Sequence, residues 1–326
     1  MSGSSKVGIF YNSQIPERLA ILLRDMLPDG FELITLETDD DSERREKIQD
    51  ARIVVVAAKP LREEILEAGS NVKLVHHQGV SFQDTLPLAA MKARGIRLAI
   101  TPGGTTESVA EHTIMLMLAA LRHLPYADSQ LRQDQWLINE LRLDSRELRF
   151  CRVGIVGMGR IGQAVARLLN AFGTTGSYYD PQVALPKEEE RRLGFEKQDL
   201  ETVLRSSQIL TLHVPCNEHT RHIIDEKAMS LLPDKAVIIN AARGGLIDEI
   251  ALLAALSTGK LGAVALDCFE QEPPDPKSGL IQHPNVVLTP HIAAGTRDAI
   301  TEKWRFMYRN MVSFTQSGHL ENEIAL

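Results

Sequence analysis

The sequence predicts an α/β protein built from two Rossmann-like, doubly wound domains. Short apolar strands alternate with stretches of helical apolar period along most of the chain, which is typical of a parallel sheet covered by helices. At 326 residues the chain is too long for one ordinary core, so we expect two domains. The third observation is a Gly-rich turn at residues 157–162, which follows an apolar strand at 153–156 and opens a helical stretch at 161–172.

The first hundred residues contain five expected strands with helical stretches between most of them. The strands cover residues 6–11, 32–37, 52–58, 73–77 and 97–101, and the helical stretches include 16–26, 61–68 and 88–94. The acidic run at 37–43 is expected to be a solvated loop. The breaker-rich segment Thr-Pro-Gly-Gly at 101–104 predicts a domain boundary.

A long apolar helix is expected directly after this boundary. Ser108 and Glu111 have the spacing of a capping box, and the residues from Ile114 to Leu121 are apolar nearly all round the helix. Such a helix must be buried, and part of its surface is expected to meet a second subunit in a homodimer.

Four strands are expected after the second βα unit, at residues 209–214, 236–242, 262–269 and 286–290. Polar or special residues lie near the carboxyl ends of these strands, namely Pro215, Arg243, Asp267 and His291. Ligands of open α/β sheets bind outside the carboxyl ends of the strands, so these residues are expected to converge beside a bound dinucleotide. No strand is expected after the last helical stretch, 297–315, so this stretch is expected to cross back to the first domain.

The Gly-rich turn has the form Gly157-x-Gly159-x-x-Gly162, the dinucleotide fingerprint. The first glycine makes the tight turn, the second lets the backbone approach a pyrophosphate, and the third packs the helix against the strand. Arg160 and Ile161 begin the helix and should touch the pyrophosphate side. The spacing therefore predicts nucleotide binding here.

Asp180 ends the next expected strand, where a carboxylate can accept hydrogen bonds from ribose hydroxyls. A 2′-phosphate at that position would meet a negative charge, and the following residues, Pro181 to Val183, offer no phosphate clamp. Asp180 therefore favours NAD over NADP.

Composition excludes several classes of partner. The net charge of −7 does not indicate the basic surface that nucleic-acid binding needs, and it argues against binding to an anionic membrane surface. The three cysteines form no CxxC pair, which fits a reducing compartment, and no metal site is expected. No secretory leader is expected, because the apolar stretch at residues 7–11 is too brief for one, and the longest apolar run, 113–121, is too short to span a bilayer. We therefore expect a soluble, cytoplasmic protein.

Four motifs in order, at residues 157–162, 240–249, 266–273 and 289–296, resemble those of the D-isomer-specific 2-hydroxyacid dehydrogenase family. The similarity runs from about residue 50 to residue 300. It implies NAD(H)-dependent interconversion of a small D-2-hydroxy acid and its 2-oxo acid. It also implies an NAD-binding domain, 104–294, inserted into a discontinuous, flavodoxin-like substrate domain made of 1–103 and 295–326.

Three side chains are the candidate catalytic residues. Hydride transfer to a ketone leaves alkoxide character on oxygen, and His291 is the natural proton donor. Glu272 can accept from the distal ring nitrogen and fix the tautomer, a pair that the family pattern also uses. Arg243 leaves the sheet at the cleft, where its planar guanidinium can hold a carboxylate at two points. Asp248 is expected to cap the following helix instead.

The resemblance also implies further contacts to the cofactor, with Asp267 holding the nicotinamide amide. The residues concerned are Thr113, Val214, Pro215, Ala241, Ala242, Arg243, Asp267, His291 and Ala294.

One segment departs from the family pattern. A Gly-rich loop after the fourth strand usually binds the substrate carboxylate through backbone N–H groups, but here Ser81 and Phe82 stand where a glycine is expected. The backbone near Val80, Ser81 and Phe82 is still expected to bind the substrate, with the Phe82 side chain reshaping the pocket. His76 and His77 before it are expected to be strand-end residues.

Several functions share these motifs. The enzymatic alternatives are a phosphoglycerate, a glyoxylate or hydroxypyruvate, or a phosphite dehydrogenase of the same architecture. A different class is a non-catalytic, NADH-sensing scaffold that resembles the family's transcriptional corepressors. The complete set of Arg243, Glu272 and His291 favours the enzyme.

Overall fold

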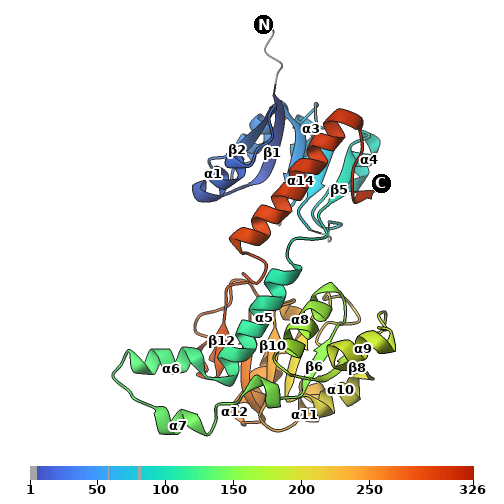
Figure 1. Ribbon diagram of the computed structural model, residues 1–326. Coiled ribbons are helices and arrows are strands. Elements are labelled where there is room, and N and C mark those ends of the chain that lie inside the picture. Colours follow the sequence, from blue (N-terminus) through green and yellow to red (C-terminus); the bar gives the residue numbers. More distant parts are fainter. Residues whose placement is uncertain (1–5, 58, 80–81) are drawn as a thin grey trace. The chain divides into compact units, whose positions relative to one another are not determined.

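The computed structural model describes residues 6–57, 59–79 and 82–326. The chain divides into two compact units: unit 1 joins Met1–Gly104 to Arg297–Leu326, and unit 2 is Thr105–Thr296. Each unit has its own sheet with helices packed on it, as Figure 1 shows. The predicted fold class, two doubly wound α/β domains, is confirmed.

The sheet of unit 1 has the strand order β13-β5-β4-β3-β1-β2, and the short β13 alone among its described strands runs antiparallel to its neighbour. Its strands are β1 (Val7–Gln14), β2 (Phe31–Leu36), β3 (Ala51–Val56), β4 (Leu74–His77), β5 (Arg97–Ile100) and β13 (Glu323–Ile324). Its helices are α1 (Glu17–Asp25), α2 (Asp41–Lys47), α3 (Glu63–Ala68), α4 (Leu88–Ala93) and α14 (Arg297–Ser317).

The last helix, α14, covers one face of this sheet (Figure 1). Trp304 is buried and stacks on Tyr11 of β1 with ring centroids 5.7 Å apart. Tyr308 donates a hydrogen bond of 3.0 Å from its hydroxyl to the carbonyl oxygen of Leu23 in α1. These contacts bind the C-terminal segment to the N-terminal strands, because the apolar face of β1 and its neighbours needs this cover.

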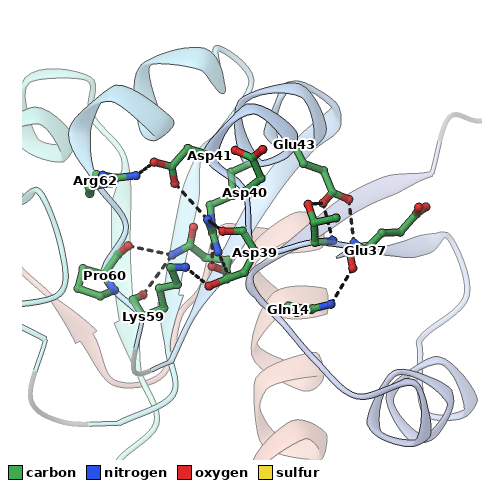
Figure 2. Close-up of polar contacts among 12 residues, drawn as sticks. Gln14, Glu37, Asp39, Asp40, Asp41, Glu43, Lys59, Pro60 and Arg62 are labelled. Carbon is green, nitrogen blue, oxygen red and sulfur yellow. Dashed lines mark hydrogen bonds and ion pairs between the residues drawn. The ribbon is translucent and has the colours of Figure 1, made fainter.

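The acidic run at 37–43 is more ordered than the solvated loop expected for it. Arg44, only 2% exposed, pairs with both Asp39 and Asp41, and Figure 2 shows these carboxylates also meeting Lys59 and Arg62. Periodicity in the sequence gives no sign of this network, because two of its cations, Lys59 and Arg62, come from the segment that follows β3. The network ties the end of β2 to the segment that follows β3.

The sheet of unit 2 is parallel throughout its described strands, with the order β12-β11-β10-β9-β6-β7-β8. The strands are β6 (Val153–Val156), β7 (Gly176–Tyr179), β8 (Phe195–Lys197), β9 (Ile209–Leu212), β10 (Ala236–Asn240), β11 (Leu261–Leu266) and β12 (Val286–Leu288). The strand order reverses at β6, since β7 lies on one side of it and β9 on the other. Such a switch point is where ligands of this fold class bind.

The helices of unit 2 cover both faces of its sheet. They are α5 (Thr106–Leu121), α6 (Leu124–Leu131), α7 (Ile138–Arg142), α8 (Arg160–Ala171), α9 (Lys187–Leu193), α10 (Leu200–Ser206), α11 (Glu226–Leu231), α12 (Glu249–Ser257) and α13 (Gly279–Gln282). None of the described helices is long and apolar enough to cross a membrane.

The apolar helix α5 differs from its prediction in two respects. It begins at Thr106, so Ser108 lies within the first turn and donates its hydroxyl to the carbonyl oxygen of Ala293 rather than capping the helix. Its apolar side chains, among them Ile114, Leu116 and Met117, are buried in the core of unit 2 itself. The helix therefore needs no second subunit to cover most of its surface.

The buried His76 predicts an acid-sensitive unit 1. His76 is fully buried and accepts a hydrogen bond of 3.1 Å from Asn310, and burial lowers its pKa from 6.5 to about 4. The unfolded chain therefore binds a proton that the folded unit does not, between pH 6.5 and 4. The contribution of neutral His76 to the free energy of unfolding is fully present above pH 6.5. It falls by about 2–3 kcal/mol as the pH drops to 4.5.

Urea unfolding at pH 7 and 4.5 measures this loss, with Trp304 fluorescence as the probe in a Trp136→Phe background. His76→Gln should remove most of the His76 contribution. His319→Gln, an exposed position of the same unit, should leave the parental pH dependence unchanged. An equal acid loss in parent and His76→Gln would contradict the assignment.

Candidate active site

The Gly-rich turn connects β6 to α8 at the switch point of the unit 2 sheet. Gly157 has a φ of 100°, and a Cβ there would lie 2.6 Å from the carbonyl oxygen of His213. A Cβ at Gly162 would overlap the carbonyl oxygen of Gly157, so these two glycines are required by the fold. A Cβ at Gly159 would meet nothing within 4 Å. The open space at Gly159 leaves the backbone accessible to an incoming group, as the fingerprint requires.

Asp180 follows β7 and is buried next to this turn. One carboxylate oxygen accepts from the N–H of Met158 at 2.8 Å, and the other accepts from the N–H groups of Gln182 and Val183. These three hydrogen bonds compensate the charge of the buried carboxylate. Asp180 therefore holds the Gly-rich turn and its own turn in place before any cofactor arrives.

The segment after β10 presents Arg243. The side chain of Asn240 accepts from the N–H of Ala242 at 3.1 Å and donates to the carbonyl oxygen of Arg243 at 2.9 Å. These two bonds shape the turn, and the Arg243 side chain is exposed at its end. A Cβ at Gly244 would overlap the backbone of Phe269, so the segments after β10 and β11 are in direct backbone contact.

Asp267, at the end of β11, organises the turn that follows β12. Its Oδ1 accepts from the hydroxyl of Thr289 at 2.6 Å and from the N–H of Ile292 at 2.9 Å, and its Oδ2 accepts from the N–H of Ala293 at 2.8 Å. The carboxylate is buried, where a charge must be compensated by hydrogen bonds. His291 lies inside this turn with a φ of 50°.

His291 and Glu272 form a hydrogen-bonded pair. The ring Nδ1 lies 2.9 and 2.8 Å from the two carboxylate oxygens of Glu272, and one of these oxygens also accepts from the N–H of Phe269. Because Glu272 can only accept while it is ionised, Nδ1 carries the proton and Nε2 remains for a reacting group. Both side chains are more than a third exposed, so the pair is accessible to a ligand.

Two predicted contacts, Thr113 and Phe82, are buried in this structure. Thr113 is fully buried, and its hydroxyl donates to the carbonyl oxygen of Val109 within α5. The ring of Phe82 packs in the apolar core of unit 1 and does not reshape a pocket. Val80 and Ser81 lie outside the described residues, and their role in binding substrate stays a prediction.

The remaining predicted cofactor contacts are at least partly accessible at the carboxyl edge of the unit 2 sheet. Arg160, Pro215 and Ala294 are exposed, while Ile161, Val214, Ala241 and Ala242 are half-buried. Among the residues that the structure describes, no group of three or more His, Cys, Asp or Glu side chains could hold a metal ion.

Sequence reasoning missed two residues of this edge, Asn240 and His112. Asn240 ends a buried strand, and an Asn at such a place commonly bonds to the backbone two residues on, which is a recognisable signal. His112 lies on α5, and its Nε2 is 3.0 Å from the hydroxyl oxygen of Thr289. No spacing in the sequence connects these two positions.

A Gly-rich turn at the switch point of a parallel sheet, with an acidic residue after the next strand, defines a dinucleotide-binding domain. Residues 114–293 match the family model of the D-isomer specific 2-hydroxyacid dehydrogenase NAD binding domain. The chain belongs to the D-isomer-specific 2-hydroxyacid dehydrogenase family. The predictions of the family, of an NAD-dependent dehydrogenase and of NAD as the cofactor are thereby confirmed.

Individual relatives agree with this assignment. The chain is 40% identical to a hydroxypyruvate reductase of Thermotoga maritima over 76% of its own length and 79% of the relative's. It is 37% identical to a D-3-phosphoglycerate dehydrogenase of Archaeoglobus fulgidus over 84% of its length, but spans only 51% of that longer protein. The solved structure of a D-2-hydroxyisocaproate dehydrogenase matches with a TM-score of 0.83 at 28% identity, covering 97% of this chain and 99% of that one.

Proposed function

We propose that the protein reduces a small 2-oxo acid to its D-2-hydroxy acid, and catalyses the reverse oxidation, with Arg243, Glu272 and His291 as the reacting set. The observation that carries the proposal is the His291–Glu272 pair, which stands on the same sheet edge as Arg243. NADH, when bound, supplies the hydride. The alternative of a non-catalytic scaffold is not favoured, because a scaffold has no need of an assembled acid–base pair.

His291 moves the proton. During reduction the carbonyl oxygen becomes a hydroxyl oxygen, and the Nε2 proton of the imidazolium is transferred to it. Glu272, bonded to Nδ1, holds the ring in orientation and stabilises its positive charge. During oxidation the neutral ring takes the proton back from the hydroxyl group.

Arg243 anchors the acid. Its guanidinium is exposed after β10, and its planar fork can donate two parallel hydrogen bonds to a carboxylate. The same positive charge polarises the neighbouring carbonyl group toward hydride attack.

Unit 2 is proposed as the cofactor domain and unit 1 as the substrate domain. In unit 2 the pyrophosphate is assigned to Gly157, Gly159 and Gly162 with Arg160 and Ile161, the ribose to Asp180, and the nicotinamide amide to Asp267. Further contacts are assigned to Val214, Pro215, Ala241, Ala242 and Ala294. The three free cysteines, Cys151, Cys216 and Cys268, support a cytoplasmic location.

Arg243→Ala should lower kcat/KM for the preferred 2-oxo acid by a hundredfold or more, because losing a charge partner of a desolvated carboxylate costs about 2–5 kcal/mol. Arg243→Lys should recover little, since an ammonium lacks the planar fork. The measurement is NADH consumption with a panel that includes glyoxylate, hydroxypyruvate, pyruvate and longer 2-oxo acids. NADH affinity should stay close to the parental value.

Absence of turnover with every acid in the panel would refute the proposed activity, and parental kcat/KM in Arg243→Ala would remove Arg243 from the site.

The same panel with NADPH tests Asp180: a lower kcat/KM than with NADH is expected in the parent, and comparable values would contradict the role given to this carboxylate.

A homodimer is also proposed, through the arm made of α6 and α7 rather than through α5. The arm projects from unit 2 (Figure 1), and its large apolar side chains are open to solvent, Trp136 at 73% and Leu143 at 89% exposed. Leu131 and Ile138 extend the same apolar surface along a hollow of about 740 Å³. Clustered apolar exposure of this kind marks an interface.

Sedimentation equilibrium should give a dimer for the parent and a monomer for the double variant Trp136→Ser with Leu143→Ser. Ile250→Ser, which removes an apolar side chain 84% exposed on α12, should remain dimeric. A monomeric parent, or a dimeric arm variant, would contradict the proposed interface.

A further inference from the structure

The side chain of His112 lies in a polar cluster beneath the turn that carries His291. It comes from the second turn of α5, is 13% exposed, and its Nε2 lies 3.0 Å from the hydroxyl oxygen of Thr289 and 3.4 Å from Oδ1 of Asp267. All three residues belong to unit 2. Neither the reaction nor the family motifs account for a histidine at this position.

The hydrogen bonds of the cluster determine the tautomer of His112. The Thr289 hydroxyl has one proton, and at 2.6 Å from a buried carboxylate that can only accept, it donates this proton to Asp267. The Thr289 oxygen must then accept from His112, so Nε2 of His112 carries a proton. The chain of donors runs from His112 through Thr289 to Asp267.

This chain controls two features of the site at once. Asp267 also accepts from the N–H groups of Ile292 and Ala293, so its orientation sets the turn on which His291 stands. Asp267, although fully buried in this structure, is also the residue to which the nicotinamide amide is assigned. A donor that fixes the Thr289 hydroxyl therefore fixes both the amide acceptor and the position of the proton donor.

We propose that His112 is a positioning residue for hydride transfer: through Thr289 it orients Asp267, and with it the nicotinamide acceptor and the His291 turn. The inference rests on the proposed function and extends it to a residue that touches neither substrate nor cofactor. A merely structural histidine would fill space in α5 and would not need an N–H group at this one position.

Replacing His112 with Gln or with Asn distinguishes a positioning role from a merely structural one, because the two amide side chains differ only in length. The amide nitrogen of Gln can occupy the place of Nε2, whereas the shorter Asn side chain cannot reach Thr289. His112→Asn and His112→Leu should lower kcat/KM for the preferred 2-oxo acid by about tenfold to a hundredfold, mostly through kcat. His112→Gln should stay within about threefold of the parent. Glu111→Gln, at the exposed neighbouring position on α5, should match the parent.

Binding provides a readout besides activity. ADP-ribose lacks the nicotinamide, so its affinity, measured by calorimetry, should be unchanged in every variant, while NADH should bind more weakly to His112→Asn and His112→Leu. A parent without turnover would refute the proposed function, yet the two affinities would still test His112. Parental NADH affinity in His112→Asn, an equal fall in ADP-ribose affinity, or failure of His112→Gln to rescue would each overturn the inference.

Discussion

The proposed active site of this protein depends on one buried carboxylate, that of Asp267. It lies at the end of β11 and accepts hydrogen bonds from a hydroxyl group and two backbone N–H groups of the next segment. A buried carboxylate without these partners would be costly, so its burial and the shape of the turn enforce each other. The left-handed backbone of His291 is held within that turn.

Asp180 repeats this arrangement at the Gly-rich turn, again with three donors on one carboxylate. Both residues lie where parallel strands end, and both are buried. A carboxylate that shapes a loop is already oriented and desolvated, so a ligand that completes its hydrogen bonds meets a preorganised partner. In the proposed function, loop architecture and cofactor recognition therefore share the same side chains.

Close backbone packing joins the proposed catalytic residues, which follow different strands. The contact between Gly244 and Phe269 brings the Arg243 segment against the segment that leads to Glu272. Phe269 in turn donates its N–H to Glu272, which holds His291. A Cβ at Gly244 would overlap the backbone of Phe269 and Glu270, so close contact between these two segments requires glycine beside Arg243.

Periodicity and turn chemistry in the sequence were sufficient for the two parallel sheets, the Gly-rich turn and the cap that Asp248 makes on α12. Local patterns could not show partners that come from distant segments. The spacing predicted Ser108 as a helix cap, yet its hydroxyl donates to the carbonyl oxygen of Ala293, and Thr113, a candidate cofactor contact, is fully buried. The contact between His112 and Thr289 could not be predicted from the sequence for the same reason, since it depends on how α5 packs on the sheet.

The most direct test of this account is Asp267→Asn. Asn keeps the size of the side chain but replaces one acceptor with a donor, which would face the N–H or hydroxyl donors of the turn. We expect kcat/KM for 2-oxo acid reduction to fall by about a hundredfold or more while ADP-ribose affinity stays at the parental value. Parental kcat/KM in Asp267→Asn would contradict the claim that this carboxylate organises the active site.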